Sequence, residues 1–138
     1  MKVGVVGAGT MGNGIAHVFA QYGHNVILCD LSEDILKRAI NTISENLDRQ
    51  IKKGIVKAEE KEIIINRIKT TTNLEDMSEA ELVIEAVVEK EDVKRDVFSK
   101  LDKITKENVI LASNTSSISI TKLSKATNRP DKVIGMHC

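Results

Sequence analysis

Short apolar runs alternate along this chain with longer segments in which apolar residues recur at helical spacing. The short runs predict buried strands, and apolar residues three or four positions apart predict amphipathic helices. Strands are predicted at 3–6, 26–29, 68–71, 82–84, 109–112 and 132–136, with helices at 10–22, 35–53, 58–67, 90–104 and 119–126 and a polar connector at 73–81. Because strands and helices alternate, we predict an α/β protein with a doubly wound, mostly parallel sheet.

The first predicted strand runs directly into Gly7-Ala8-Gly9-Thr10-Met11-Gly12 and then into a helix. This is the context that a GxGxxG motif requires before it predicts dinucleotide binding. Gly7 permits the tight turn, Gly9 lets a pyrophosphate approach the backbone, and Gly12 lets the helix pack closely on the strand. The helix N-terminus would then face the phosphates. An ordinary glycine-rich turn remains the alternative, but the position behind the first strand favours a Rossmann dinucleotide site.

Asp30 ends the second predicted strand, 18 residues after Gly12. This is close to the spacing of the acid that accepts the ribose hydroxyls of NAD, and a carboxylate there would repel the 2′-phosphate of NADP. The alternative is that Asp30 merely precedes a helix start, since Ser32 is a good N-cap residue. We favour the ribose role and therefore predict NAD as the cofactor.

The link between the second and third strands is longer than a crossover needs and is predicted as a helical hairpin. Its first helix would be about 30 Å long at about 1.5 Å per residue. Arg49, Lys52 and Lys53 lie near its tip. From the residues alone, a solvated face is the simplest interpretation of these charges.

Polar residues follow several strands where a parallel sheet would gather them at one edge: the glycine turn, Asp30, Glu89, the segment 113–117 and His137. Doubly wound sheets bind ligands at the carboxyl ends of their strands. His137 is a candidate base for a hydroxyl proton, because imidazole titrates near neutral pH. Ser116 and Asn114 are candidates for hydrogen bonds to the reacting oxygen or the nicotinamide ribose, although turn or capping roles are equally open.

The composition excludes several classes of partner. Lys and Arg together number 20, as do Asp and Glu, and only 2% of residues are aromatic. Nothing here indicates nucleic acid or a membrane surface. Cys29 and Cys138 show no metal-ligand spacing, and Cys29 is expected to be a buried, reduced thiol. Without a signal peptide or a long apolar run, we expect a cytoplasmic protein.

Taken together, the chain resembles the NAD-binding domain of the 3-hydroxyacyl-CoA dehydrogenases, most closely the bacterial 3-hydroxybutyryl-CoA enzymes. The resemblance covers essentially all 138 residues and depends on GAGTMGNGIA, the helical insert, VIEAVVE, ASNTSS and RPDKVIGMH. It implies NAD-dependent oxidation of an (S)-3-hydroxyacyl-CoA, or the reverse reduction.

The resemblance also implies roles for single residues. His137 would be the catalytic base, with Ser116 contacting the substrate oxygen and the nicotinamide side. Glu89 and Lys94 would contact the cofactor, although the residues alone would make them surface charges. Lys53 would meet the CoA phosphates. Asn46 stands where some relatives have a CoA-contacting serine. The cofactor-binding set would then be Gly7, Ala8, Gly9, Thr10, Met11, Gly12, Asp30, Glu89, Lys94, Asn114 and Ser116.

Two departures from the family pattern concern the end of the sequence. The family continues beyond its histidine with Phe-Phe-Asn-Pro, an orienting glutamate and a helical domain that forms the homodimer, whereas this sequence has Cys138. We therefore expect residues 1–138 to form one NAD-binding domain that binds NAD but turns over substrate poorly by itself, because no glutamate here orients His137.

Two alternatives stay open. One is a dehydrogenase of a free hydroxy acid, which would share the glycine turn but would not be expected to carry the basic-tipped hairpin together with SNTSS and GMH. The other is a non-catalytic NAD-sensing module, for which His137 would be dispensable.

Overall fold

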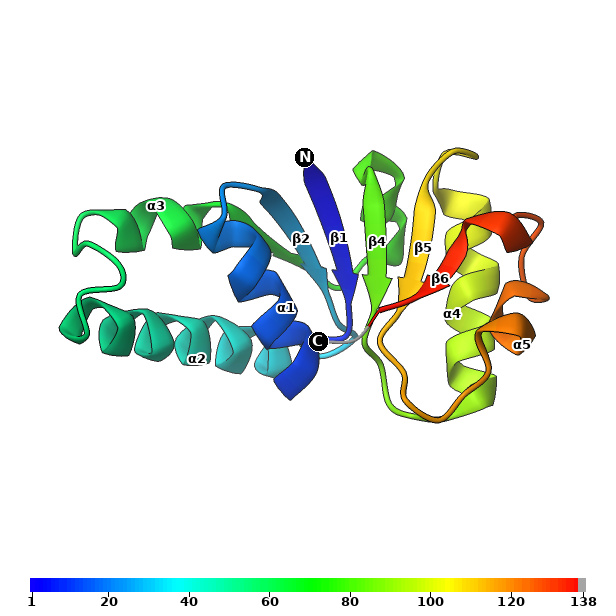
Figure 1. Cartoon of the computed structure of the whole chain (residues 1–138), viewed down its shortest axis with the longest axis horizontal. Helices are drawn as coiled ribbons and strands as arrows, with labels where there is room; N and C mark the ends of the chain where they lie inside the picture. Colours follow the sequence, from blue (N-terminus) through cyan, green and yellow to red (C-terminus); the bar gives the residue numbers. More distant parts are fainter. Residues whose placement is uncertain (137–138) are drawn as a thin grey trace.

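A computed structural model describes residues 1–136 and contains a six-stranded, all-parallel sheet in the order β3-β2-β1-β4-β5-β6 (Figure 1). The strands are β1 (Lys2–Val6), β2 (Asn25–Cys29), β3 (Ile68–Thr71), β4 (Leu82–Glu85), β5 (Ile110–Ser113) and β6 (Val133–Gly135). The helices are α1 (Thr10–Gln21), α2 (Glu33–Lys52), α3 (Glu60–Asn66), α4 (Glu91–Ile104) and α5 (Ile120–Ser124), with 3-10 turns η1 (Leu74–Glu79) and η2 (Pro130–Lys132). The doubly wound Rossmann sheet and the insert between the second and third strands are confirmed.

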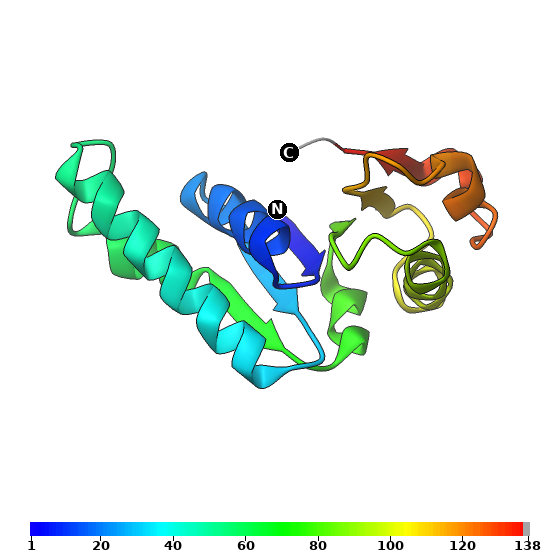
Figure 2. The same cartoon turned by 90° about the horizontal axis from the view of Figure 1, so that it is seen from below.

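Alternation along the strands builds one core on each face of the sheet. Val3 and Val5 of β1 belong to the core under α1, α2 and α3, whereas Val6 belongs to the core under α4 and α5. Figure 2, viewed from the carboxyl edge, shows α1 and α4 on opposite sides of the sheet. Because helices cover both faces, most residues of the strands are apolar; the exception is the edge strand β3, whose Lys69 and Thr70 are exposed.

The helical hairpin projects from one side of the sheet (Figure 1). The α2 helix begins after Ser32, whose side chain accepts a hydrogen bond from the Ile35 amide at 3.3 Å. Its buried stripe consists of Leu36, Ala39, Ile43 and Leu47. Ile64 of α3 joins this core. The two helices therefore bury a shared apolar face, and the tip carries the charges.

The segment predicted as a polar connector at 73–81 does join β3 to β4, and residues Leu74–Glu79 within it form the 3-10 turn η1. Its Met77 is fully buried. A Cβ added to Gly4 would overlap the Met77 sulfur, so the glycine in β1 makes room for this side chain. The remaining differences are element ends that shift by one or two residues, such as α3, which begins at Glu60 rather than at 58, and β5, which begins at Ile110 rather than at 109.

A buried ion pair joins elements at the amino edge of the sheet. The Nε of Arg129 donates to Asp102 Oδ1 at 2.6 Å, and its guanidinium also donates to the carbonyls of Lys106 and Val109. The segment before β6 is thereby tied to α4 and to the start of β5.

Within residues 1–136, the helices are all too short or too polar to span a lipid bilayer.

Candidate functional site: the carboxyl edge of the sheet

The glycine turn has the geometry that a phosphate-binding loop requires. Gly7 adopts a φ of +103°, which L side chains rarely tolerate. A Cβ added to Gly12 would overlap the Gly7 carbonyl oxygen, whereas one added to Gly9 would meet no atom of residues 1–136 within 4 Å. Gly7 and Gly12 are therefore required by the fold itself. Gly9 leaves open space at the start of α1.

Asp30 lies against this turn. Its Oδ2 accepts a hydrogen bond from the Ala8 amide at 3.0 Å, and its Oδ1 accepts one from the Ser32 amide at 3.2 Å. Ser32, not Asp30, caps α2. The structure thus brings Asp30 to the glycine turn, and its role toward the ribose stays a prediction.

A pocket of about 690 Å³ extends from the glycine turn across the ends of β2 and β4. Asp30 lies on its wall, and most of the remaining wall is aliphatic. Leu31 and Val88, which line it, are 93% and 62% exposed. Large exposed aliphatic side chains that line a cavity provide apolar faces against which a flat ring can pack.

A second pocket of about 300 Å³ adjoins the first and shares Met11, Ala86 and Val87 with it. The rest of its wall is Glu89, Asn114, Thr115 and Ser116. The predicted residues of the glycine turn, the segment after β4 and the segment after β5 are therefore brought together along one edge.

Glu89 joins the two segments that form this second pocket. Its Oε2 accepts hydrogen bonds from Thr115 Oγ1 at 2.7 Å, Ser117 Oγ at 3.0 Å and the Ser116 amide at 3.2 Å. These bonds, led by that from Thr115 and joined by Lys94, lower the pKa of Glu89 from 4.5 to about 2. Glu89 is thus a carboxylate at neutral pH.

Lys94 is not the surface charge that the residues alone indicated. Its side chain is 1% exposed, and its Nζ lies 2.6 Å from Glu85 Oε2 and 3.2 Å from Glu89 Oε1. Sequence reasoning assigned no role to Glu85, which is 0% exposed. A signal did exist: Lys94 falls on the helical stripe of Phe98, Leu101 and Thr105, and Glu85 follows buried Val83 at strand spacing.

Burial raises the pKa of the Cys29 thiol to about 11, with smaller contributions from Asp30 and Asp76. Cys29 is a free, buried cysteine, as predicted, and stays protonated beside the larger pocket.

The residues predicted to meet CoA lie elsewhere. Lys53 follows the last residue of α2, so about 20 residues of helix, or roughly 30 Å, separate it from Ser32. Figure 1 shows this tip extending away from the sheet. The side chain of Asn46 accepts a hydrogen bond from Arg49. The structure therefore does not bring Lys53 and Asn46 to the two pockets.

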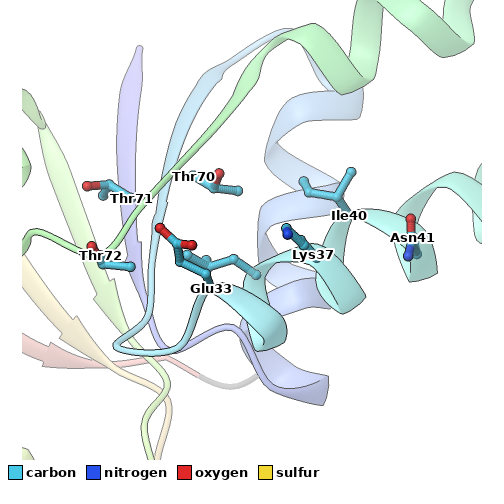
Figure 3. A pocket seen from close by; sticks show the side chains of 8 residues that line it. Glu33, Lys37, Ile40, Asn41, Thr70, Thr71 and Thr72 are labelled. Atoms are coloured by element: carbon cyan, nitrogen blue, oxygen red, sulfur yellow. The ribbon is translucent and has the colours of Figure 1, made fainter.

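A further hollow of about 510 Å³ lies between α2 and the edge strand β3 (Figure 3). Glu33, Lys37 and Asn41 of α2 face Thr70 and Thr72 across it. Its lining contains none of the predicted site residues.

His137 and Cys138 lie outside the described residues. The last described residue, Met136, donates its amide to the Ser113 carbonyl at 2.9 Å, at the carboxyl end of β5. The role of His137 stays a prediction.

The chain matches a known protein family over nearly its whole length. The model of the 3-hydroxyacyl-CoA dehydrogenase NAD-binding domain matches residues 2–138. The chain is 52% identical to 3-hydroxybutyryl-CoA dehydrogenase of Bradyrhizobium diazoefficiens and 44% identical to that of Clostridioides difficile, each over 99% of this chain. The matches span 46% and 49% of those proteins, so the chain covers about half the length of these curated relatives.

Solved structures agree with the sequence comparison. The crystal structure of (S)-3-hydroxybutyryl-CoA dehydrogenase from Ralstonia eutropha superposes with a TM-score of 0.95 at 47% identity, over 99% of this chain and 48% of that one. With its glycine turn, parallel sheet and adjoining pockets, the chain belongs to the NAD-binding domain family of the 3-hydroxyacyl-CoA dehydrogenases.

Proposed function

We propose that this chain is the NAD-binding half of a dehydrogenase that interconverts (S)-3-hydroxyacyl-CoA and 3-oxoacyl-CoA, with 3-hydroxybutyryl-CoA as a substrate. The observation that carries the proposal is the pair of adjoining pockets at the carboxyl edge. The glycine turn borders one pocket and the Ser/Asn/Thr segment after β5 borders the other. A dinucleotide has two halves joined by a pyrophosphate, and this edge offers a matching pair of sites.

The residues present fit NAD. The Gly7–Gly12 turn and the start of α1 would hold the pyrophosphate, and Asp30 would accept the adenosine ribose hydroxyls. Glu89, Asn114 and Ser116 line the pocket that remains for the nicotinamide end. NAD, when bound, supplies the two-electron acceptor for the reaction (S)-3-hydroxyacyl-CoA + NAD⁺ ⇌ 3-oxoacyl-CoA + NADH + H⁺.

The protein's own contribution to the chemistry is to move a proton. The neutral imidazole of His137 would take the proton from the substrate 3-hydroxyl in oxidation and return it to the 3-oxo oxygen in reduction. The hydroxyl of Ser116 would donate a hydrogen bond to the same oxygen. These two roles come from the sequence motifs GMH and SNTSS.

Two partners complete the proposal. An acyl-CoA would extend its phosphates toward Lys53 and Asn46 on the hairpin. A homodimer would form through the part of the relatives that lies outside this chain, since each relative is about twice as long as the match.

The test uses this chain joined to the C-terminal half of the Clostridioides difficile relative. We expect NADH-dependent reduction of acetoacetyl-CoA and little reduction of free acetoacetate. His137→Ala should lower kcat by about 10²-fold or more, which is typical for loss of a positioned acid or base. Equal turnover of the free acid, or full activity of the His137 variant, would contradict the proposal.

A further inference from the structure

Glu85 is a fully buried carboxylate, and both of its oxygens accept hydrogen bonds from other residues of the protein. Oε1 accepts a hydrogen bond from Ser113 Oγ at 2.5 Å. Oε2 accepts hydrogen bonds from Lys94 Nζ at 2.6 Å and from the Val87 amide at 2.7 Å. A residue so enclosed can act on a ligand only through its neighbours.

Lys94 connects Glu85 to residues that line the smaller pocket. An ammonium group has three donors. In Lys94 they reach Glu85 Oε2, the Val87 carbonyl at 3.2 Å and Glu89 Oε1 at 3.2 Å. The ammonium therefore fixes the backbone just after β4 and the carboxylate of Glu89 at the same time.

Glu89 extends this chain of contacts to the segment after β5. Its other oxygen receives the side chains of Thr115 and Ser117 and the amide of Ser116. One continuous path thus runs from Ser113 through Glu85, Lys94 and Glu89 to Ser116. It closes around the smaller pocket, whose wall includes Val87, Glu89, Asn114, Thr115 and Ser116.

Such a path is a poor way to gain stability, because burying an ion pair costs about as much as the attraction returns. Its neighbours on the α4 stripe, Phe98 and Leu101, show that an apolar side chain suits this layer. The charged path instead holds the segments after β4 and after β5 in one arrangement, although neither segment has the regular hydrogen bonds of a helix or sheet.

We propose that Glu85 is a positioning residue for cofactor binding: it fixes Lys94 and, through Glu89, the Ser116 segment that receives the nicotinamide end of NAD. This inference rests on the proposed function. It assigns the effect of Glu85 to where its oxygens lie rather than to its charge.

Two substitutions separate position from charge. Glu85→Asp keeps the charge but withdraws the carboxylate by one methylene. Glu85→Gln keeps the reach, because its amide oxygen can accept from Lys94 and Val87 while its NH₂ group donates to the Ser113 hydroxyl. The matched control is Asp102→Asn, which breaks the buried ion pair between Asp102 and Arg129. Asp102 lies on the same helix as Lys94, eight residues or about 12 Å away, toward the other end of α4.

The measurement is NADH affinity of the 138-residue chain by fluorescence titration, with the folded state of each variant checked by circular dichroism. Glu85→Asp should weaken NADH binding about tenfold, since displacements near 1 Å at a binding site have large effects. Glu85→Gln should stay within about threefold of the original chain, and Asp102→Asn within about twofold. In amide NMR spectra, Glu85→Asp should shift the Ser116 and Ser117 signals, and Asp102→Asn should not.

If Glu85→Asp folds poorly, Ser113→Ala serves instead, because it releases one Glu85 oxygen without changing charge or reach; we then expect about threefold weaker binding and a shifted Ser116 signal. The proposal is overturned if Glu85→Asp (or Ser113→Ala in its place) binds NADH as tightly as the original chain does. It is also overturned if Asp102→Asn loses as much NADH affinity as that variant, or if Glu85→Gln loses more NADH affinity than Glu85→Asp. A chain that binds no NADH before any substitution would refute the proposed function instead.

Discussion

At the residue scale, some glycines of the turn are required by the fold, whereas others leave open space that a ligand could use. A Cβ at Gly12 would overlap a backbone carbonyl, whereas a Cβ at Gly9 or Gly14 would meet open space among the described residues. Gly9 has φ −69° and ψ −165°, which any residue adopts. The three positions therefore look alike in the sequence but have different physical roles.

Gly9→Ala is predicted to fold with a stability loss of at most about 1 kcal/mol, because alanine is only a poorer N-cap than glycine. The same Cβ occupies the space proposed for the pyrophosphate, so NADH affinity should fall at least tenfold. Gly14→Ala is the matched control, with NADH affinity unchanged and stability raised by about 0.5–1 kcal/mol. Chemical denaturation and NADH titration measure both. Unchanged NADH binding in Gly9→Ala would contradict the assignment of the turn.

Glu89 gives a prediction about acid stability. Its folded pKa, about 2, lies below the ordinary 4.5, so it stabilises the fold fully above about pH 4.5 and loses this effect as the pH falls toward 2. The difference in unfolding free energy between the original chain and Glu89→Gln should therefore be constant near neutral pH and shrink below about pH 5. Urea unfolding at a series of pH values measures it. A difference that stays constant down to pH 3 would show that the hydrogen bonds from Thr115 and Ser117 do not hold in solution.

At the element scale, the tip of the helical hairpin lies far from the carboxyl edge of the sheet. The α2 helix starts beside Asp30 and carries Lys53 about 30 Å away. A substitution at the tip should thus act on one ligand and not on the other.

Lys53→Ala, in the chain joined to the relative's second half, is predicted to raise KM for acetoacetyl-CoA about threefold to tenfold, because the proposed contact with a CoA phosphate would be lost. KM for NADH should not change. Lys103→Ala, an exposed lysine in the last turn of α4, is the control for loss of a surface charge. Steady-state kinetics with each substrate varied in turn provides the readout. A rise in KM for NADH, or an equal effect of Lys103→Ala, would refute the CoA role of the tip.

The elements also show what could be predicted from the sequence. Apolar runs located five strands, since strands covered on both faces are largely apolar, and the β-branched residues of Ile68-Lys69-Thr70-Thr71 indicated the edge strand β3. The buried residues of α4 are Lys94, Phe98 and Leu101. Lys94 shares the helical spacing of Phe98 and Leu101, but periodicity alone does not show that its ammonium meets the carboxylates of Glu85 and Glu89.

At the scale of the whole molecule, the order of the parallel strands brings motifs that are far apart in the sequence to one edge of the sheet. The glycine turn, Asp30, Glu89 and Ser116 follow four strands that lie side by side as β2-β1-β4-β5. The parallel direction of these strands was predictable from their alternation with helices, and it suffices to gather the motifs at one edge. The hydrogen bonds that lock Glu89 to the segment after β5 could not be predicted, because they depend on backbone conformations that no local pattern encodes.

The central claim is that this edge binds NAD with Asp30 at the adenosine ribose. Parallel titrations of the 138-residue chain with NADH and NADPH test it most directly. We predict saturable binding of one NADH per chain and at least tenfold weaker binding of NADPH, because the Asp30 carboxylate opposes a 2′-phosphate. Equal or tighter binding of NADPH, or no saturable binding of NADH, would contradict the claim.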